Sequence, residues 1–287
     1  MNDLSKRLLV ALIGIPISIY LIIAGGLLFA SVIAGLSAIT LWEFYKLTEK
    51  RNITPHVKFG LSVNVILIIA VYFSTVNQLF SNPAILVLMA LSVITILALS
   101  ITLWSKNPNS LVNFSVTIAG ILYVTFSFSF LILIREFFTI SDPKMSNHFS
   151  AMLLLCIIFS IWICDSAAYF VGKSIGKHKL FPSVSPKKTW EGAIGGFFGG
   201  VLAMIGFANV PFLLGGFPLI NAAIIGAIIG TIGQIGDLAE SKLKRDAEVK
   251  DSSALLPGHG GALDRFDSIM FVVPAVFIYL YIVYLLR

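Results

Sequence analysis

The chain has 287 residues, of which 57% are hydrophobic and 12% are charged. Soluble domains carry roughly one quarter charged residues, so this composition excludes an ordinary soluble protein and predicts an all-α, polytopic integral membrane protein. The net charge of +6 does not predict nucleic-acid binding, because Lys and Arg collect on the cytoplasmic loops of membrane proteins.

Apolar runs long enough to cross a bilayer, about 20 residues each, recur along the whole chain. The first run extends to Leu41 and is broken at Gly25-Gly26, so we interpret it as two retained helices and not as a cleaved signal peptide. About nine transmembrane helices are predicted, near residues 8–24, 27–46, 60–79, 84–104, 111–134, 149–171, 190–212, 218–237 and 266–286.

Basic residues are distributed unevenly between the two sides of this arrangement. If the N-terminus lies inside, 17 of the 20 Lys and Arg residues fall on the cytoplasmic side, and the other three are residues 135, 144 and 287. This asymmetry follows the positive-inside rule. It predicts a multi-pass protein of the cell (inner) membrane with a cytoplasmic N-terminus, an external C-terminus and two cytoplasmic basic loops, 172–189 and 238–265.

Ionisable residues in or at the ends of the predicted helices lie mostly in the second half of the chain. The acidic ones there are Asp165, Glu191, Asp237, Asp264 and Asp267. Charged side chains within a membrane are costly and usually functional. We therefore expect residues 1–150 to form a scaffold and residues 151–287 to carry the site, within one integral membrane unit.

The stretch from Ser241 to Asp267, which we call the signature segment, combines five cations with five carboxylates. Its Pro257-Gly258-His259-Gly260-Gly261 run can turn sharply and approach a ligand, and its backbone N–H groups can surround a phosphate. Asp264 and Asp267 stand one helical turn apart, so both can face one side and suit Mg²⁺ bound to substrate phosphates. The alternative is a solvated loop with incidental ion pairs.

Four short runs in the signature segment match one pattern: Ser241-x-Leu243-Lys244-Arg245, Lys250-Asp251-x-Ser253, Leu256-Pro257-x-His259-Gly260-Gly261 and Asp264-Arg265-Phe266-Asp267. Together they resemble the signature of the phosphatidate cytidylyltransferases, also called CDP-diacylglycerol synthases. One departure is Ala262, where that family usually has a larger aliphatic residue. This departure implies slight repacking without a change of chemistry.

A second run, Ser185-Pro186-Lys187-Lys188-Thr189-Trp190-Glu191-Gly192, precedes the seventh predicted helix. Thr189 is placed to cap that helix, and a helix N-terminus beside two lysines makes an anion site. Lysines at the cytoplasmic edge also satisfy the positive-inside rule without any ligand. The run resembles the second characteristic motif of the same family, which favours the anion site.

Asp165 lies inside the sixth predicted helix, where a carboxylate costs about 2.5–3.5 kcal/mol on insertion scales. It either hydrogen-bonds a neighbouring helix or lines a polar cavity. The resembled family has an acidic residue in this context, which favours the cavity.

Asp237 follows a seam of small residues formed by Gly226, Gly230 and Gly233. Small residues at this spacing allow membrane helices to approach closely, and one more turn along the seam should direct Asp237 toward Asp264 and Asp267. Such seams serve equally within one protomer and between protomers, so a homodimer stays open.

The resemblance implies the reaction of CTP with phosphatidate to give CDP-diacylglycerol and pyrophosphate, in phospholipid biosynthesis. The implied partners are CTP, phosphatidate and membrane lipid, and no nucleic acid; the implied cofactor is Mg²⁺, with a second cation left open. The expected catalytic residues are Asp264, Lys244, Arg245 and Arg265, and the expected metal ligands are Asp237, Asp264 and Asp267. Substrate contacts are expected from Ser185, Lys187, Lys188, Thr189, Glu191, Lys250, Asp251, His259, Gly260, Gly261 and Asp165.

Two alternatives stay open at this point. Another lipid-phosphate enzyme, either a different cytidylyltransferase or a polyprenol kinase, would share the architecture and differ in substrate. An ion-coupled transporter would also use carboxylates within the membrane, although the dense charged loop argues against it.

Overall fold

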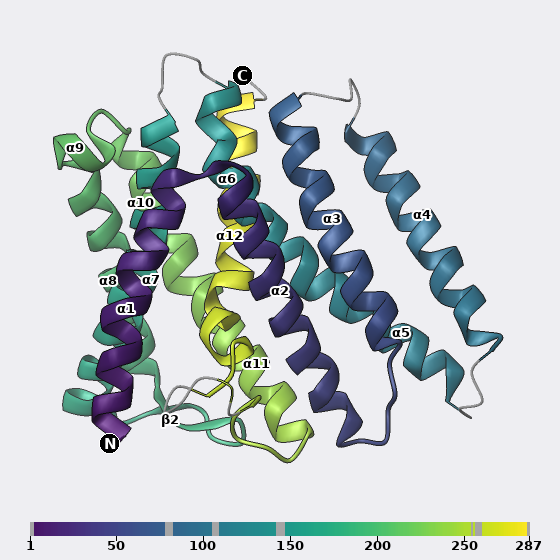
Figure 1. Cartoon of the computed structure of the whole chain (residues 1–287). Helices are drawn as coiled ribbons and strands as arrows, with labels where there is room; N and C mark the ends of the chain where they lie inside the picture. The colour runs from purple at the N-terminus through teal and green to yellow at the C-terminus, as the bar shows by residue number, and fades with distance from the viewer. Residues whose placement is uncertain are drawn as a thin grey trace. The chain divides into compact units, whose positions relative to one another are not determined.

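The computed structural model describes residues 3–77, 83–104, 109–141, 147–253, 255 and 260–285. Helices make up nearly all the regular structure of these residues (Figure 1). They are α1 (Asp3–Ala24), α2 (Gly26–Glu49), α3 (Val57–Asn77), α4 (Pro83–Thr102), α5 (Ser110–Gly120), α6 (Phe126–Ser141), α7 (Asn147–Ile175), α8 (Trp190–Ala208), α9 (Pro211–Leu214), α10 (Leu219–Ile228), α11 (Gln234–Asp246) and α12 (Leu263–Leu285). Two π-helical turns, η1 (Ile121–Thr125) and η2 (Ile229–Gly233), join α5 to α6 and α10 to α11.

Within the described residues, seven helical stretches are long and apolar enough to cross a membrane by length and composition. Two shorter apolar helices, Leu12–Ala24 and Val87–Thr102, lie where the first and fourth spans are predicted. The all-α, polytopic membrane class is therefore confirmed, whereas the count of nine spans is not.

Two predicted spans end well before their helices do. The helix predicted to end at residue 134 continues to Ser141, and the one predicted to end at residue 237 continues to Asp246. Arg135, which the sequence places in an external loop, is instead buried within α6. Its Nε donates to the Ile22 carbonyl at 2.6 Å and its Nη2 to the Ile23 carbonyl at 3.0 Å. Because the carbonyls at the end of α1 satisfy the guanidinium, the charge does not end the helix.

The basic loop predicted at 172–189 contains structure that the sequence did not predict. Helix α7 continues to Ile175, and a short antiparallel hairpin follows, made of β1 (Lys179–Phe181) and β2 (Ser185–Thr189). Strand β2 leads directly into α8. That helix ends at Ala208, before the predicted residue 212, because Pro211 has no N–H with which to continue it.

The chain divides into two compact units that interleave along the sequence. The first consists of Met1–Ala11, Gly26–Leu133 and Asp246–Arg265, and the second of Leu12–Gly25, Ile134–Arg245 and Phe266–Arg287. The division does not follow a single cut near residue 150. Most of the signature segment packs with the N-terminal helices, whereas its two ends belong to the second unit.

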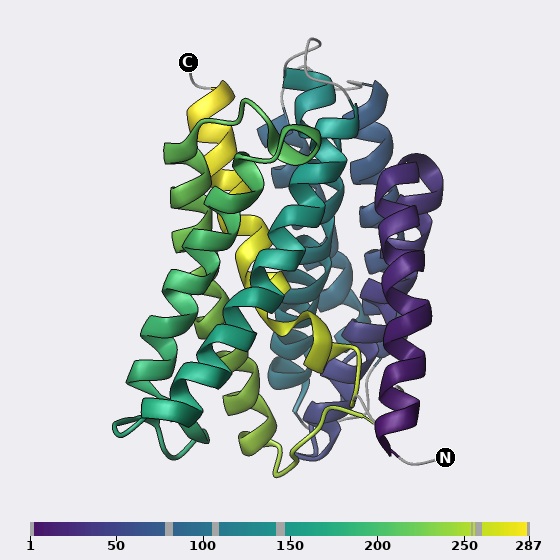
Figure 2. The same ribbon diagram turned by 90° about the vertical axis from the view of Figure 1, so that its left-hand side faces the viewer.

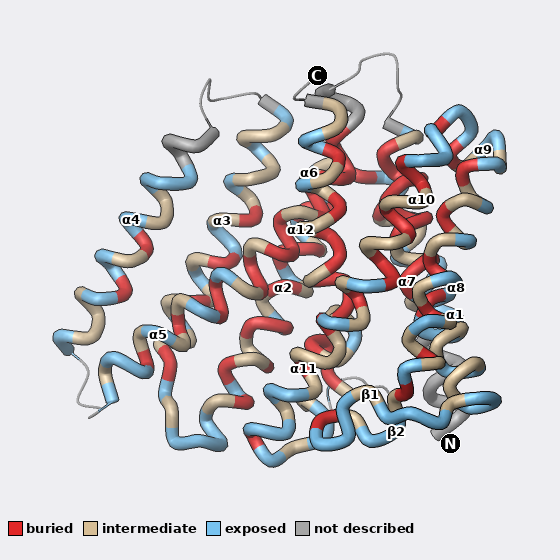
Figure 3. The backbone as a smooth tube through the Cα atoms, turned by 180° about the vertical axis from the view of Figure 1, so that it is seen from behind, coloured by how far each residue is buried: buried red, intermediate tan, exposed pale blue. Residues whose placement is uncertain are grey.

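In the first unit, α2 packs against α3, and both contact the turn η1. Many residues along α2 are buried, as the red segments of Figure 3 show. Ser37 Oγ and Thr125 Oγ1 both donate to the Asn64 side-chain oxygen, at 2.6 and 2.8 Å, and all three side chains are fully buried. The polar groups of this apolar core thus satisfy one another, as a membrane interior requires.

In the second unit, α8 packs against both α7 and α10 (Figure 2). The predicted seam of small residues allows close packing, as expected. A Cβ on Gly226 would lie 2.5 Å from Val201 Cα, and one on Gly230 would lie 2.6 Å from Phe197 Cα. Because these neighbours are backbone atoms, they cannot move aside as a flexible side chain would. The glycines therefore allow α8 and the α10–η2 helix to approach closely.

We expect Gly230→Ala to lower the free energy of unfolding by about 1–3 kcal/mol, because the added methyl group overlaps the α8 backbone. Gly206→Ala is the matched control, since nothing lies within 4 Å of its Cβ position and Ala favours a helix over Gly by roughly 1 kcal/mol. Thermal unfolding of the purified protein in detergent measures both. Equal melting temperatures for the two variants would contradict the conclusion that Gly230 is needed for close packing against α8.

Candidate active site

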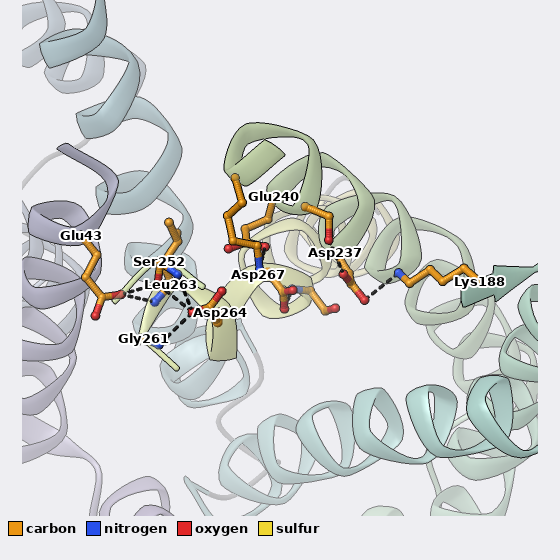
Figure 4. Close-up of polar contacts among 12 residues, drawn as sticks. Glu43, Lys188, Asp237, Glu240, Ser252, Gly261, Leu263, Asp264 and Asp267 are labelled. Atoms are coloured by element: carbon orange, nitrogen blue, oxygen red, sulfur yellow. Dashed lines mark hydrogen bonds and ion pairs between the residues drawn. The ribbon is translucent and has the colours of Figure 1, made fainter. Parts of the chain in front are cut away.

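Lys188 and Asp237 form an ion pair in the second unit (Figure 4). Lys188 Nζ donates to Asp237 Oδ2 at 2.6 Å, and both side chains remain partly exposed. Lys188 lies in β2, and Asp237 lies in the first turn of α11. The π-turn η2 immediately precedes α11, and such turns occur frequently at functional sites. The pair therefore joins the basic hairpin to an acidic residue within a membrane span.

Two more carboxylates of the second unit share the electrostatic environment of this pair. Asp165 on α7 and Asp267 on α12 both interact with Asp237, and they also interact with each other. The cations that compensate them are Lys188 for Asp165 and Lys244 for Asp267. Asp165 is exposed and Asp267 partly exposed. Three helices thus carry carboxylates that influence one another electrostatically and are at least partly exposed.

Lys244 is fixed by a neighbour on its own helix. Its Nζ lies 2.6 Å from Glu240 Oε2, one turn earlier in α11, and the Glu240 side chain is fully buried. A buried carboxylate needs a partner, and Lys244 supplies it. Of the two predicted cations, Lys244 therefore has a structural role in neutralising Glu240, whereas Arg245 is exposed.

The β-hairpin places its polar residues at the start of α8. Thr189 caps this helix as predicted, since its Oγ1 accepts a hydrogen bond from Gly192 N at 3.2 Å. Glu191 contacts His178, with 2.6 Å between Oε1 and Nδ1, and so ties the start of the hairpin to the helix. Lys187 is exposed and Ser185 partly exposed. The helix N-terminus thus has one lysine facing solvent and one paired with Asp237.

The signature segment is held in the first unit by a glutamate that sequence reasoning missed. Glu43 on α2 is fully buried, and its carboxylate accepts hydrogen bonds from Ser252, Ser253, Ala262 and Leu263. The available signal was an acidic residue in the last turn of the second predicted helix, and such a residue in a membrane span is functional by default.

Asp264 joins the same arrangement. Its Oδ2 accepts hydrogen bonds from Ser252 N at 2.9 Å, Ser252 Oγ at 2.8 Å and Gly261 N at 2.8 Å (Figure 4). Gly260, directly before Gly261, has a φ of +78°, a conformation that suits glycine. Asp264 therefore holds two parts of the signature segment together in the first unit. Asp267, one turn later in α12, belongs to the second unit.

The other predicted residues of the signature segment lie in the first unit or outside the described residues. Lys250, Asp251 and Arg265 are exposed in the first unit. His259 lies outside the described residues, as do Pro257 and Gly258. In the part of the chain that the structure describes, no group of three or more His, Cys, Asp and Glu side chains is close enough to hold a metal ion unaided.

The helices and this site define an integral membrane protein in which acidic side chains of the spans interact with basic residues, one of them in the β-hairpin. Its sequence matches the Cytidylyltransferase family over residues 5–283. It is 32% identical to the "Phosphatidate cytidylyltransferase" of Bacillus subtilis over 96% of this chain and 97% of that protein. It is 34% identical to the protein of the same name from Staphylococcus saprophyticus, over 93% and 95% of the two chains, and 30% identical to that from Synechocystis, over 95% of each.

The match covers nearly the whole chain, and the relatives align along almost their full lengths. The protein therefore belongs to the Cytidylyltransferase family. The family resemblance expected from the two motifs is confirmed, and neither a transporter nor a polyprenol kinase is favoured.

We expect Lys188→Met to lower the free energy of unfolding by about 1–2 kcal/mol, because Asp237 loses a charge-assisted hydrogen bond. Lys187→Met removes the same charge from an exposed neighbouring position and should change stability by less than about 0.5 kcal/mol. Thermal unfolding in detergent compares the two. A larger effect at residue 187 than at residue 188 would contradict the pairing.

Proposed function

We propose that this protein is a phosphatidate cytidylyltransferase, which converts CTP and phosphatidate into CDP-diacylglycerol and pyrophosphate. The observation that carries the proposal is the family match over residues 5–283, with relatives of that name aligned over 93–96% of the chain. The carboxylates of the spans and the lysines near them support it, because a reaction between a nucleotide and a lipid phosphate needs charged groups at the edge of the bilayer.

The proposed reaction brings two polyanions together. A phosphate oxygen of phosphatidate attacks the α-phosphorus of CTP, and the bond from that phosphorus to the bridging oxygen breaks, so that pyrophosphate leaves. The nucleophile is already ionised and needs no general base. The residues must therefore neutralise charge and align the reacting atoms.

We assign Lys188 to the phosphates of the substrates. Lys188 lies in the strand that leads into α8, and the backbone N–H groups at the start of that helix also favour an anion. The 2.6 Å hydrogen bond from Lys188 Nζ to Asp237 Oδ2 already restricts the side chain. Binding a phosphate therefore costs little additional side-chain entropy. Lys187 on the same strand supplies a second, exposed cation.

Asp237 and Asp267 are the residues that fit Mg²⁺ best. This ion usually takes one or two carboxylates together with substrate phosphates, and these two side chains are partly exposed and near enough to interact. When bound, Mg²⁺ supplies positive charge to the phosphates. Asp264 uses one oxygen to accept three hydrogen bonds, so we assign it first to holding the signature segment.

The direct test is pyrophosphate release by the purified protein in detergent with CTP, Mg²⁺ and phosphatidate. Release should need all three, and Asp237→Asn should lower the rate on the order of 100-fold, because charge stabilisation is lost. Glu49→Gln, an exposed change on α2, is the control. Release with a different lipid phosphate but not with phosphatidate would change the proposed substrate, and no release with any acceptor would refute the proposal.

The same proposal puts the hairpin β1–β2 on the cytoplasmic side, where CTP is present. Both native cysteines, Cys156 and Cys164, are buried, so Lys187→Cys introduces one accessible thiol. We expect it to react with a membrane-impermeant maleimide in opened membranes and not in intact cells. Labelling in intact cells would show that the hairpin lies on the external side and would contradict the proposed orientation.

A further inference from the structure

Glu43 is a fully buried carboxylate in a helix of the first unit that is otherwise rich in apolar residues. Both of its oxygens are saturated with hydrogen bonds. Oε1 accepts from Ser253 Oγ at 2.6 Å and Ala262 N at 3.1 Å. Oε2 accepts from Ser252 Oγ at 3.1 Å and Leu263 N at 2.7 Å. Figure 4 shows Glu43 facing this part of the signature segment.

All four of these donors lie far from Glu43 along the chain, between 209 and 220 residues away. Burying a carboxylate without partners is very costly, so Glu43 is stable in its position only when the signature segment is in place. Conversely, the Glu43 side chain alone accepts hydrogen bonds from both serines and from the start of α12. Glu43 and the signature segment therefore stabilise each other's conformation.

Asp264 and Gly261 complete the arrangement. Ser252 Oγ lies within hydrogen-bonding distance of both Glu43 Oε2 and Asp264 Oδ2, so the two carboxylates share its single O–H proton. A Cβ on Gly261 would overlap Ser252 Oγ and would lie 2.5 Å from Glu43 Oε2. A glycine at this position is therefore needed because the glutamate and the serine occupy the space that a side chain would fill.

We propose that Glu43 is a positioning residue of the enzyme, which sets the conformation of the signature segment at Ser252 and Ser253 and at Ala262 and Leu263. It acts through Ser252, Ser253 and Asp264 and does not touch the substrates. The exposed Lys250, Asp251 and Arg265 lie on the segment that it holds. Its effect on turnover rests on the proposed function, whereas its effect on the conformation of the segment does not.

Glu43→Gln is the sharpest test because it keeps the size of the side chain. Whichever way the new amide turns, its –NH₂ group faces one of two backbone donors, Ala262 N or Leu263 N. One hydrogen bond is then replaced by a contact between two donors. Glu49→Gln is the matched control, since Glu49 lies on the same helix but is exposed and pairs only with Lys46 among its described contacts.

Two measurements are made on each variant of the full-length protein: kcat and KM for pyrophosphate release, and backbone hydrogen exchange. We expect Glu43→Gln to lower kcat/KM about tenfold or more and to raise exchange in the peptide covering residues 252–264, with α3 and α8 unchanged. Ser253→Ala removes one of the donors to Glu43 and should give a smaller effect in the same direction. If Glu43→Gln does not fold, the same two measurements on Ser253→Ala test the proposal. In the Glu43→Gln background it should add little.

Wild-type exchange in residues 252–264 of Glu43→Gln, or an increase spread evenly over α2 and α3, would overturn the positioning role. So would wild-type kcat/KM in Glu43→Gln. A wild-type protein that releases no pyrophosphate would refute the proposed function instead, and the exchange data would still decide whether Glu43 orders the segment.

Discussion

A charge buried within apolar helices is stable only when another group of the protein neutralises or hydrogen-bonds it. Glu43 meets this requirement through four donors of the signature segment. Arg135 meets it through the carbonyls at the end of α1. In both cases the partner is distant in sequence, so the cost of burial is offset only after the chain has folded. The few charged residues of this apolar chain thereby fix how its segments are arranged within each unit.

The residues of the two motifs, together with Asp237, serve two purposes in the structure. In the second unit, Lys188, Asp237 and Asp267 form a charged cluster that remains accessible to a ligand. In the first unit, Asp264 and Gly261 hold the signature segment in a defined conformation. A motif that the sequence suggests is wholly catalytic therefore contains groups suited to binding substrates and other groups that hold the backbone in its conformation.

Much of the architecture could be predicted because it depends on local properties of the chain. The apolar runs indicated membrane helices, the spacing of Gly226 and Gly230 indicated close packing, and Thr189 indicated a helix start; all three agree with the structure. The ends of two helices were predicted too early because hydropathy cannot show that a charge such as Arg135 has a buried partner. The hairpin was missed because both strands are short and β2 is polar.

The sequence by itself determined the membrane class, the family and the identity of the charged residues, because composition and motif spacing carry that information directly. Only the tertiary structure decided which of those residues meet. It directed Asp264 to Ser252 and Gly261 of the signature segment, and it brought Glu43 to Ser252 across 209 residues. The physical reason is that hydrogen bonds and ion pairs depend on distances in space, and for groups this far apart in the chain those distances are set by helix packing.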